Sequence, residues 1–316
     1  MRFSVIIAAR NAAATLEETL DSIHRQEFRD FEVILVDDAS TDSTVQLAAR
    51  HPLEPTLVTL PLAAGPGSAR NHGARLASGD YLTFLDADDF WFPWTLSVLD
   101  EAIRANPGSS FLAGRAKRGS GGFPNPGGGR SAMEAVRFSD YFETSPRHLW
   151  IGVGGTAIER SAFNLAGGFA TWCGNGEDSD LWLRLGKTPG FIELKSPELF
   201  YYRATDDSLT RRPDRIAAGC RGLVGNESQG HYPGGVESRR RRLTLITRHT
   251  RSASLELLRH GRLREAVDLY LSTFPWNLSL FRLKYLAGFW LVWAKHPLKT
   301  APGGPFRPTP PSRPVG

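Results

Sequence analysis

The sequence predicts an α/β fold, with a parallel sheet in the first part of the chain and helices at its end. Short runs rich in β-branched residues alternate with helical patterns of about ten residues, which is typical of parallel strands joined by crossover helices. From about residue 237 the strand-like runs stop, and apolar residues recur at helical spacing. The chain therefore divides into a sheet-containing part and a helical part.

Four strand-like runs mark the first half of the predicted sheet. They are RFSVIIAA (2–9), FEVILVDD (31–38), TLVTLPL (56–62) and DYLTFLD (80–86). Helices are expected between them, at TLEETLDSIHRQ (15–26), STDSTVQLAARH (40–51) and SARNHGARLAS (68–78). This alternation predicts a Rossmann-like, nucleotide-binding half over residues 1–105.

The second half of the sheet-containing part, residues 106–230, is less regular. A helix in WTLSVLDEAIRANPG (94–108) should end before its proline, and GSGGFPNPGGG (119–129) predicts a mobile loop. Further elements are expected as strands in WIGVGGTAIER (150–160) and GFIELKSPELFYYR (190–203), around a helix at EDSDLWLRLGK (177–187). A basic helical extension follows over residues 231–300, and six prolines predict a disordered tail over residues 301–316.

Composition is that of a globular protein. The 316 residues are 41% hydrophobic, which allows a sizeable core, and the two cysteines cannot form a disulfide framework or a cysteine-rich zinc site. No apolar run reaches the roughly 20 residues that a bilayer crossing needs. We therefore expect a cytoplasmic protein, located at the inner face of the plasma membrane if its basic end binds lipid.

Acidic residues crowd the ends of two predicted strands. Asp37 and Asp38 end the second strand, and Asp86, Asp88 and Asp89 end the fourth. Ligands of open α/β sheets bind at the carboxyl ends of the strands, where crowded carboxylates repel one another unless a cation lies between them. A divalent metal such as Mg²⁺ or Mn²⁺ would relieve this repulsion and neutralise a leaving diphosphate. The alternative is that these acids cap the following helices, and Asp37 is expected to orient its loop.

Four segments, in order along the chain, resemble the family 2 glycosyltransferases of the GT-A fold. They are SVIIAARNAAATLEETLDSI, FEVILVDDASTDST, GSARNHGARLASGDYLTFLDADDFW and GNGEDSDLWLRL, within residues 3–210. The resemblance implies a GT-A fold with a mixed central sheet. It also implies metal-dependent, inverting transfer of a sugar from a UDP- or dTDP-activated donor to a glycan or lipid-linked acceptor in cell-surface polysaccharide synthesis.

The resemblance assigns a donor site residue by residue. It implies that Asp38 contacts the nucleobase, that Asp86 lies near the ribose and that Asp88 binds the metal ion. Arg70 and Asn71 match the family's Ala-Arg-Asn segment, which lines the donor site.

The catalytic base is expected at the start of the predicted helix 177–187. Inverting transfer needs a group that takes the proton of the acceptor hydroxyl, and the dipole of a helix N-terminus favours an ionised carboxylate. Asp178 matches the family's Glu-Asp base, Glu177 is assigned to acceptor binding and Asp180 to a structural role. Trp172 is a candidate for stacking on an acceptor sugar, although core packing is an equally good explanation. The three acids could also serve only as first-turn charges of the helix.

The chain departs from the family pattern at two places. The usual Pro-X-Tyr-Asn after the first strand is AARN, so Ala8 replaces the proline and Arg10 replaces the base-stacking tyrosine. A guanidinium can also stack on a base or reach a diphosphate, so we keep Arg10 as a donor-binding residue. The family's histidine in Tyr-Arg-X-His is replaced by Thr205, and Asp206, Asp207 or water could complete the metal shell instead.

The helical end of the chain is strongly basic. Residues 1–230 contain 23 Lys and Arg against 29 Asp and Glu, a net charge of −6, whereas residues 231–316 contain 15 against 4, a net charge of +11. The segments ESRRRRL (237–243) and FRLKYLAGFWLVWAKHPLK (281–299) combine these cations with aromatic residues, which favours peripheral contact with anionic lipid. A helical cap with a solvated basic face is the equal alternative. Nucleic acid is not an expected partner, because no recognition motif accompanies the charge.

Two other functions remain open from the sequence. A nucleotidyltransferase would share the nucleotide-binding half, but AARNAAAT after the first strand is not a Gly- and Lys-rich triphosphate loop. A catalytically silent, nucleotide-binding scaffold of a membrane-associated glycan complex would also fit, because Arg10 and Thr205 stand where the family has other residues.

Overall fold

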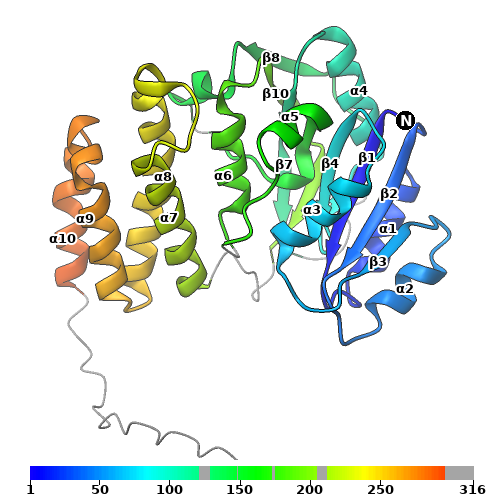
Figure 1. The fold of residues 1–316 in the computed structure, drawn as a ribbon, viewed down its shortest axis with the longest axis horizontal. Coiled ribbons are helices and arrows are strands. Elements are labelled where there is room, and N and C mark those ends of the chain that lie inside the picture. Colours follow the sequence, from blue (N-terminus) through cyan, green and yellow to red (C-terminus); the bar gives the residue numbers. More distant parts are fainter. Residues whose placement is uncertain (121–128, 148, 173–174, 205–211, 296–316) are drawn as a thin grey trace, which may run out of the picture.

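The computed structural model confirms the α/β fold with C-terminal helices (Figure 1). It describes residues 1–120, 129–147, 149–172, 175–204 and 212–295. Most of the predicted loop 119–129 and all of the predicted tail 301–316 lie outside these residues.

The central sheet has eight strands in the order β3-β2-β1-β4-β9-β6-β10-β8. Its first four strands are parallel, as predicted: β1 (Phe3–Ala9), β2 (Phe31–Asp37), β3 (Thr56–Thr59) and β4 (Tyr81–Asp86). Residues of β1 alternate between two apolar cores, with Val5 and Ile7 in one and Ile6 in the other. This alternation follows from the two-residue period of a strand and means that both faces of the sheet are covered.

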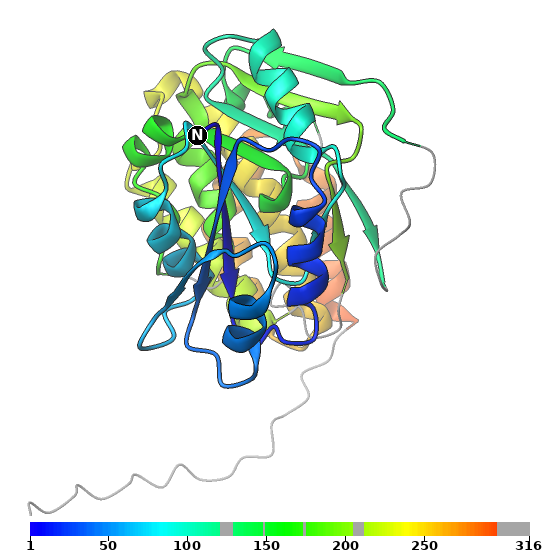
Figure 2. The same cartoon turned by 90° about the vertical axis from the view of Figure 1, so that its right-hand side faces the viewer.

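Helices cover the two faces as the crossover pattern requires. The helices that connect or follow the first four strands are α1 (Leu16–His24), α2 (Thr44–Arg50), α3 (Pro66–Leu76) and α4 (Thr95–Ala105). Leu16 and Leu20 of α1 share one core with Leu96 of α4, whereas Ala69 and Ala74 of α3 belong to the other. Figure 2 shows the N-terminal strands between α1 and α3, which lie on opposite sides of the sheet.

The second half of the sheet is mixed. It consists of β6 (Phe111–Gly114), β8 (Glu134–Phe138), β9 (Thr156–Glu159) and β10 (Phe191–Ser196), of which β9 runs antiparallel to β4 and β6. A smaller sheet has the order β5-β11-β7, with β5 (Phe90–Trp91), β7 (Ala116–Gly119) and β11 (Phe200–Arg203). The segment predicted as a strand at 150–160 forms one only over β9, because a 3₁₀ turn, Val153–Gly155, precedes it.

Shorter helical elements lie around this second half. They are the 3₁₀ turn η1 (Tyr141–Thr144), α5 (Arg160–Leu165) and α6 (Glu177–Arg184), and α6 passes into a 3₁₀ turn over Leu185–Lys187. The α-helix predicted for 177–187 is therefore shorter than expected at its C-terminal end.

Four helices complete the chain and pack as a layer beside the sheet (Figure 1). They are α7 (Pro213–Ser228), α8 (Gly235–Arg259), α9 (Leu263–Ser279) and α10 (Leu283–Ala294). The layer begins before the predicted boundary at residue 231, because α7 contacts both α8 and α9. The helical pattern predicted from about residue 237 is broken by a turn in which Gly261 has a φ of 72°. No helix in the described part of the chain is long and apolar enough to cross a membrane.

Candidate active site

The carboxyl ends of β1, β2 and β4 lie side by side and carry the acids. Register pairs Ala8 of β1 with Asp86 of β4, and Ala9 of β1 with Asp37 of β2. The acidic strand ends that the sequence placed at one edge of the sheet are therefore neighbours of the same central strand.

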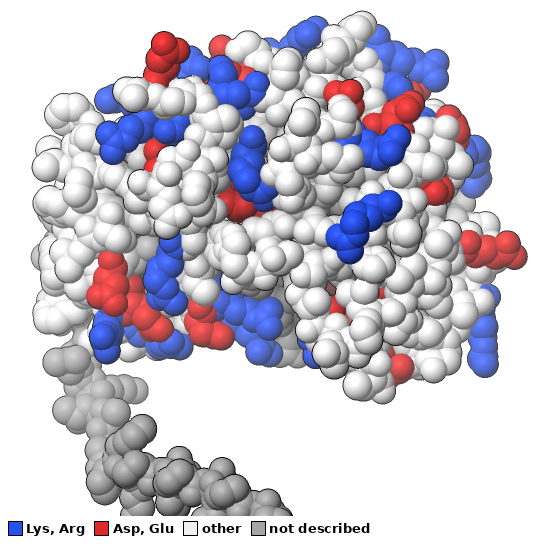
Figure 3. Space-filling view, in the orientation of Figure 1, with Lys and Arg blue, Asp and Glu red and all other residues white. Residues whose placement is uncertain are grey.

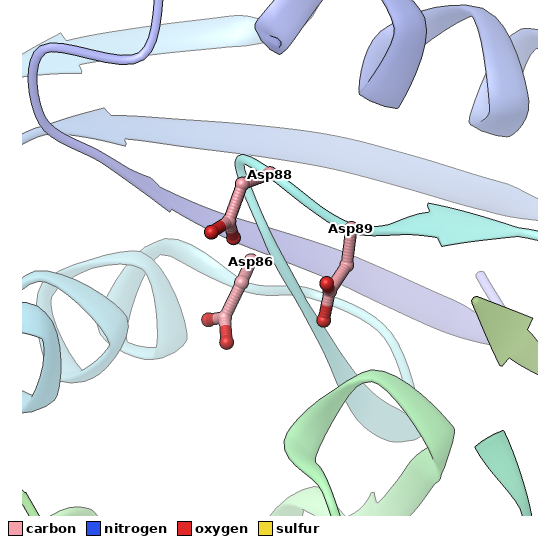
Figure 4. A group of neighbouring side chains, drawn as sticks. All are labelled: Asp86, Asp88 and Asp89. Carbon is pink, nitrogen blue, oxygen red and sulfur yellow. The ribbon is translucent and has the colours of Figure 1, made fainter. Parts of the chain in front are cut away.

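Asp86, Asp88 and Asp89 form an acidic cluster at the turn from β4 to β5. One carboxylate oxygen of each lies within 4.8 Å of the others, and Figure 4 shows the three carboxylates on the same side of the turn. The turn is held on α1, because the Thr19 hydroxyl donates to the backbone oxygens of Ala87 at 3.0 Å and Asp89 at 2.9 Å. The three carboxylates are thus held close together by the backbone.

The pKa values of Asp88 and Asp89 are raised by burial and by the crowding of the carboxylates. Burial, followed by the neighbouring Asp86 charge, raises the pKa of Asp88 to about 6. Burial and the charges of Asp86 and Asp88 raise the pKa of Asp89 well above its usual value. Asp86 and Asp88 reach the surface while Asp89 is buried, so the cluster opens to solvent on one side. Three carboxylate oxygens in this arrangement fit a hard divalent cation such as Mg²⁺ or Mn²⁺.

Arg70 of α3 links the acidic cluster to α6. One terminal nitrogen of its guanidinium donates to Asp86 at 2.5 Å and the other donates to Glu177 at 3.0 Å. The guanidinium is buried, lies over the Phe169 ring, and its pKa is raised by the two carboxylates, which outweigh desolvation. Its Nε has no hydrogen-bond partner among the described residues. Arg70 therefore links Asp86, which is predicted to bind the sugar donor, to Glu177, which is predicted to bind the sugar acceptor.

Asp178 follows Glu177 in the first turn of α6, at the site predicted for the base. The helix begins after Gly176, which has a φ of 88°, a left-handed conformation that glycine adopts without strain. Burial and then the adjacent Glu177 charge raise the pKa of Asp178 to about 6, while Arg70 and the Ser179 backbone N–H oppose the shift. Arg70 also opposes the shift of Asp88, so one guanidinium acts on both carboxylates.

Asp180 anchors α6 to the C-terminal helices, in line with its predicted structural role. Its buried carboxylate accepts hydrogen bonds from Arg184 of α6 at 2.8 Å, from Asn226 of α7 at 2.8 Å and from the Tyr232 hydroxyl at 2.8 Å. The helix that carries Asp178 is therefore held directly by the helical layer.

Asp38 and Asp37 bind backbone groups. Asp38 accepts the backbone N–H groups of Ala64 at 2.6 Å and Gly65 at 2.9 Å, which fixes the turn before α3. Asp37 accepts the Ser40 N–H and thus holds the loop after β2, as expected. Arg10 is exposed directly after β1.

Asn71 joins α3 to the segment before α6. Its amide donates to the Phe169 carbonyl at 2.8 Å and accepts the Phe169 N–H at 2.7 Å. Both ends of the amide bind this backbone, so we assign Asn71 to positioning rather than to direct contact with a donor.

Trp172 is exposed and lies against α7. A Cβ atom built on Gly222 of α7 would lie 1.8 Å from the Trp172 ring, so the indole can occupy its place only because position 222 has no side chain. Trp150 stacks on Phe200 of the small sheet and packs against Arg118. Thr205, Asp206 and Asp207 lie outside the described residues.

The structure adds Arg203 of β11, which the sequence did not single out. Its backbone N–H donates to the Asp89 carboxylate at 3.0 Å, and its Nε donates to the Asp88 carbonyl at 3.0 Å. Its guanidinium also pairs with Glu18 and lies 4.4 Å from the centre of the Phe90 ring. The only signal in the sequence was its place in the Tyr-Arg part of the segment in which Thr205 departs from the family.

The mixed sheet, with an acidic cluster at the end of its fourth strand, places the chain among the GT-A glycosyltransferases. The profile described as Glycosyl transferase family 2 matches residues 4–165, so the chain belongs to the family 2 glycosyltransferases. An uncharacterized glycosyltransferase of Haemophilus influenzae is 30% identical over 212 residues, which are 63% of this chain and 67% of that protein.

Two glycosyltransferases of known structure share the fold. TarS of Staphylococcus aureus, a poly(ribitol-phosphate) β-N-acetylglucosaminyltransferase, is 37% identical over 95 residues, which are 28% of this chain and only 17% of TarS. The structure of TarS 1–349 with UDP-GlcNAc matches 85% of this chain and 89% of that chain, with 17% identity and a TM-score of 0.54. The mannosyltransferase PcManGT of Pyrobaculum calidifontis, with GDP-Man and Mn²⁺, matches 93% and 84%, with 18% identity and a TM-score of 0.56.

Proposed function

We propose that this glycosyltransferase transfers a sugar from a nucleotide-diphosphate donor, UDP- or dTDP-activated, with inversion at the anomeric carbon and with the help of a divalent metal. The observation that carries the proposal is the Arg70 bridge between Asp86 and Glu177. Through it the acidic cluster and Asp178 lie on either side of one guanidinium, which suits a donor diphosphate on one side and a base on the other.

Asp88, with Asp86 and Asp89, would hold Mg²⁺ or Mn²⁺. The support is the spacing of their oxygens, together with the Mn²⁺ bound by PcManGT. A bound metal ion supplies positive charge that stabilises the departing diphosphate. Arg70 and Arg10 would add cationic charge to the donor site. Asp38 would contribute to binding of the donor's nucleobase through the turn before α3, which its carboxylate fixes.

Asp178 is the proposed base. As the acceptor oxygen attacks the anomeric carbon, the bond from that carbon to the diphosphate oxygen breaks and the hydroxyl proton passes to the Asp178 carboxylate. A pKa of about 6 leaves this carboxylate ionised near neutral pH and still able to hold a proton. Glu177, whose Oε1 accepts from Arg70, would position the first turn of α6 and border the acceptor.

The acceptor is proposed to be a glycan or lipid-linked precursor of a cell-surface polysaccharide. TarS, by its name, acts on poly(ribitol phosphate), and another relative, AmsB of Erwinia amylovora, is a glycosyltransferase of amylovoran biosynthesis. In this chain the exposed Trp172 ring, which is backed by α7, offers an apolar face on which a sugar could stack. A site at the inner face of the plasma membrane fits such an acceptor.

The experiment is a thermal-shift screen of nucleotide sugars with and without Mn²⁺, followed by turnover assays with the donor that stabilises most. A donor present at 100 times its Kd stabilises the folded protein by about 2.7 kcal/mol. Asp88→Asn should abolish the Mn²⁺-dependent part of the stabilisation by the donor. Asp268→Asn should leave it unchanged, because Asp268 is an exposed acid on α9. Equal Mn²⁺ effects in both variants would remove Asp88 from the metal site. Release of pyrophosphate instead of nucleoside diphosphate would indicate a nucleotidyltransferase.

A further inference from the structure

The outer side of the last two helices carries an exposed apolar surface. The residues that form this outer face are Leu271, Phe274 and Leu278 of α9, Phe281 in the turn, and Trp290 and Leu291 of α10. On α9 they recur three or four positions apart, which places them on one side of that helix, and Trp290 and Leu291 are neighbours on α10. Phe281 is 77% exposed and Leu291 is 68% exposed, so the described part of the chain leaves these side chains in water.

The stripes on the two helices adjoin. The Tyr270 ring is buried between them, with its centre 5.9 Å from that of Phe274 and 5.4 Å from that of Trp290. The core beneath consists of Phe289, stacked on Tyr270, and neighbouring apolar residues. The outer face is therefore one surface on a packed helix pair, rather than scattered single side chains. Exposed surfaces of this kind mark contacts with a partner or a membrane.

The charge around the outer face is mainly positive. Residues 269–316 contain six Lys and Arg and no Asp or Glu, and three of these cations, Arg282, Lys284 and Lys295, lie at the two ends of α10. Figure 3 shows uncharged side chains over α9 and α10 at the left edge, with most charged side chains elsewhere. Asp268, three positions before Leu271 on α9, is the one exposed acid beside this face in the described part of the chain. An apolar surface with mainly cations around it is complementary to an anionic surface with an apolar interior.

We propose that the outer face of α9 and α10 docks on the surface of an anionic lipid bilayer. The aromatic and leucine side chains would enter the headgroup region, and the exposed Lys284 and Lys295 would bind lipid phosphates. A second copy of the chain fits less well, because a symmetric contact would bring the cations of both copies together, and Asp268 is the one acid among residues 268–316 that could pair with them.

The proposed surface differs from the arginine run that the sequence emphasised. Arg242 of that run is buried, pairs with Glu227 at 2.7 Å and donates to the backbone oxygens of Pro233 and Gly235. Its charge is therefore paired with Glu227 inside the protein. Arg239, Arg240 and Arg241 are exposed on α8, but no exposed aromatic side chain accompanies them there. Apolar contact and charge coincide on α9 and α10 instead.

The test is flotation of the full chain with vesicles of phosphatidylcholine alone or with roughly 30% phosphatidylglycerol. We expect binding to the anionic vesicles only, weakened by salt, and at least about tenfold weaker for Leu291→Asp and for Phe281→Asp. The matched control is Leu165→Asp, at the end of α5, because Leu165 is 89% exposed and lies on the sheet-containing part. It should bind as the unchanged protein does. No donor or acceptor is needed, so the result is independent of the proposed reaction.

Three results would overturn the proposal. The first is absence of binding to anionic vesicles. The second is equal binding by Leu291→Asp and Leu165→Asp, with loss of binding only when Arg239, Arg240 and Arg241 are changed to Gln. The third, measured by light scattering without lipid, is a dimer that Leu291→Asp dissociates, because this would identify a second copy as the occupant. Thermal unfolding of each variant checks that it folds.

Discussion

The Arg70 guanidinium lies 3.0 Å from Glu177, across 107 positions of sequence. This contact joins α3, which connects β3 to β4, to the first turn of α6. It brings the proposed base near the acidic cluster, although the two derive from opposite halves of the sheet-containing part. The spacing between the acidic cluster and the first turn of α6 therefore depends on a single buried cation.

Replacing that cation should weaken both stability and activity. Arg70→Met leaves Glu177 and Asp86 without their shared partner, and removing one member of a buried ion pair costs about 3 kcal/mol. We expect this loss in urea unfolding, together with a fall in kcat/KM. Arg75→Met on the same helix is the control, because Arg75 is exposed. Comparable losses in the two variants would contradict the bridging role.

Removing the proposed base should affect chemistry and spare binding. Asp178→Asn keeps the size of the side chain and its bond to the Ser179 N–H, so we expect kcat to fall by about 10²–10⁴ with an unchanged donor Kd. Asp214→Asn, an exposed acid in the first turn of α7, should leave both constants unchanged. Normal turnover by Asp178→Asn would show that another group accepts the proton.

Asp178 should also make stability depend on pH. Its pKa is about 6 in the folded chain, against 3.8 for an ordinary aspartate, so the folded state binds the proton more tightly. The free energy of unfolding should therefore fall as pH rises from about 4 to about 6. Asp178→Asn should melt at a higher temperature than the unchanged chain at pH 7 and at a similar temperature below pH 4. A constant difference in melting temperature across this pH range would show that burial does not raise the pKa of the Asp178 carboxyl.

The pH dependence of kcat should have the opposite sign to the pH dependence of stability. Because only the ionised carboxylate accepts a proton, kcat should rise with pH and level off above an inflection near pH 6. The measurement is a pH–rate profile at saturating donor. A flat profile down to pH 5 would exclude Asp178 as the group that titrates.

The Tyr232 hydrogen bond to Asp180 tests whether the helical layer positions α6. Tyr232→Phe removes the hydrogen bond to Asp180 and should cost about 1.5 kcal/mol. It should also lower kcat without changing donor Kd, because α6 is less firmly positioned. Tyr285→Phe, which removes a 2.8 Å hydrogen bond to Ser254 within the helical layer, should affect stability alone. An equal loss of kcat in both variants would indicate a general effect of the layer.

Much of the acidic site followed from sequence, because strand period and crossover pattern put the ends of β1, β2 and β4 at one edge of the sheet. Asp86 and Asp88 could be placed together by this argument, and the family motif extended it to Asp178. Local rules of this kind apply wherever a residue's position is set by its own strand or helix.

The rest depended on contacts between distant segments. No local pattern could show that Arg203 of β11 returns to the turn after β4, or that Arg242 is buried beside Glu227 while its three basic neighbours are exposed. Asn71 matched the family segment, yet its amide binds the Phe169 backbone, 98 positions away. Likewise, the start of the helical layer at α7 becomes visible only from its packing.

The bare backbone at Gly222 lets α7 lie directly against the Trp172 ring. Adding a methyl group there, as in Gly222→Ala, would push the indole of Trp172 outward while leaving every acid in position. Under the proposed role of Trp172 in acceptor stacking, the choice of acceptor sugar would therefore depend on a helix that belongs to the C-terminal layer.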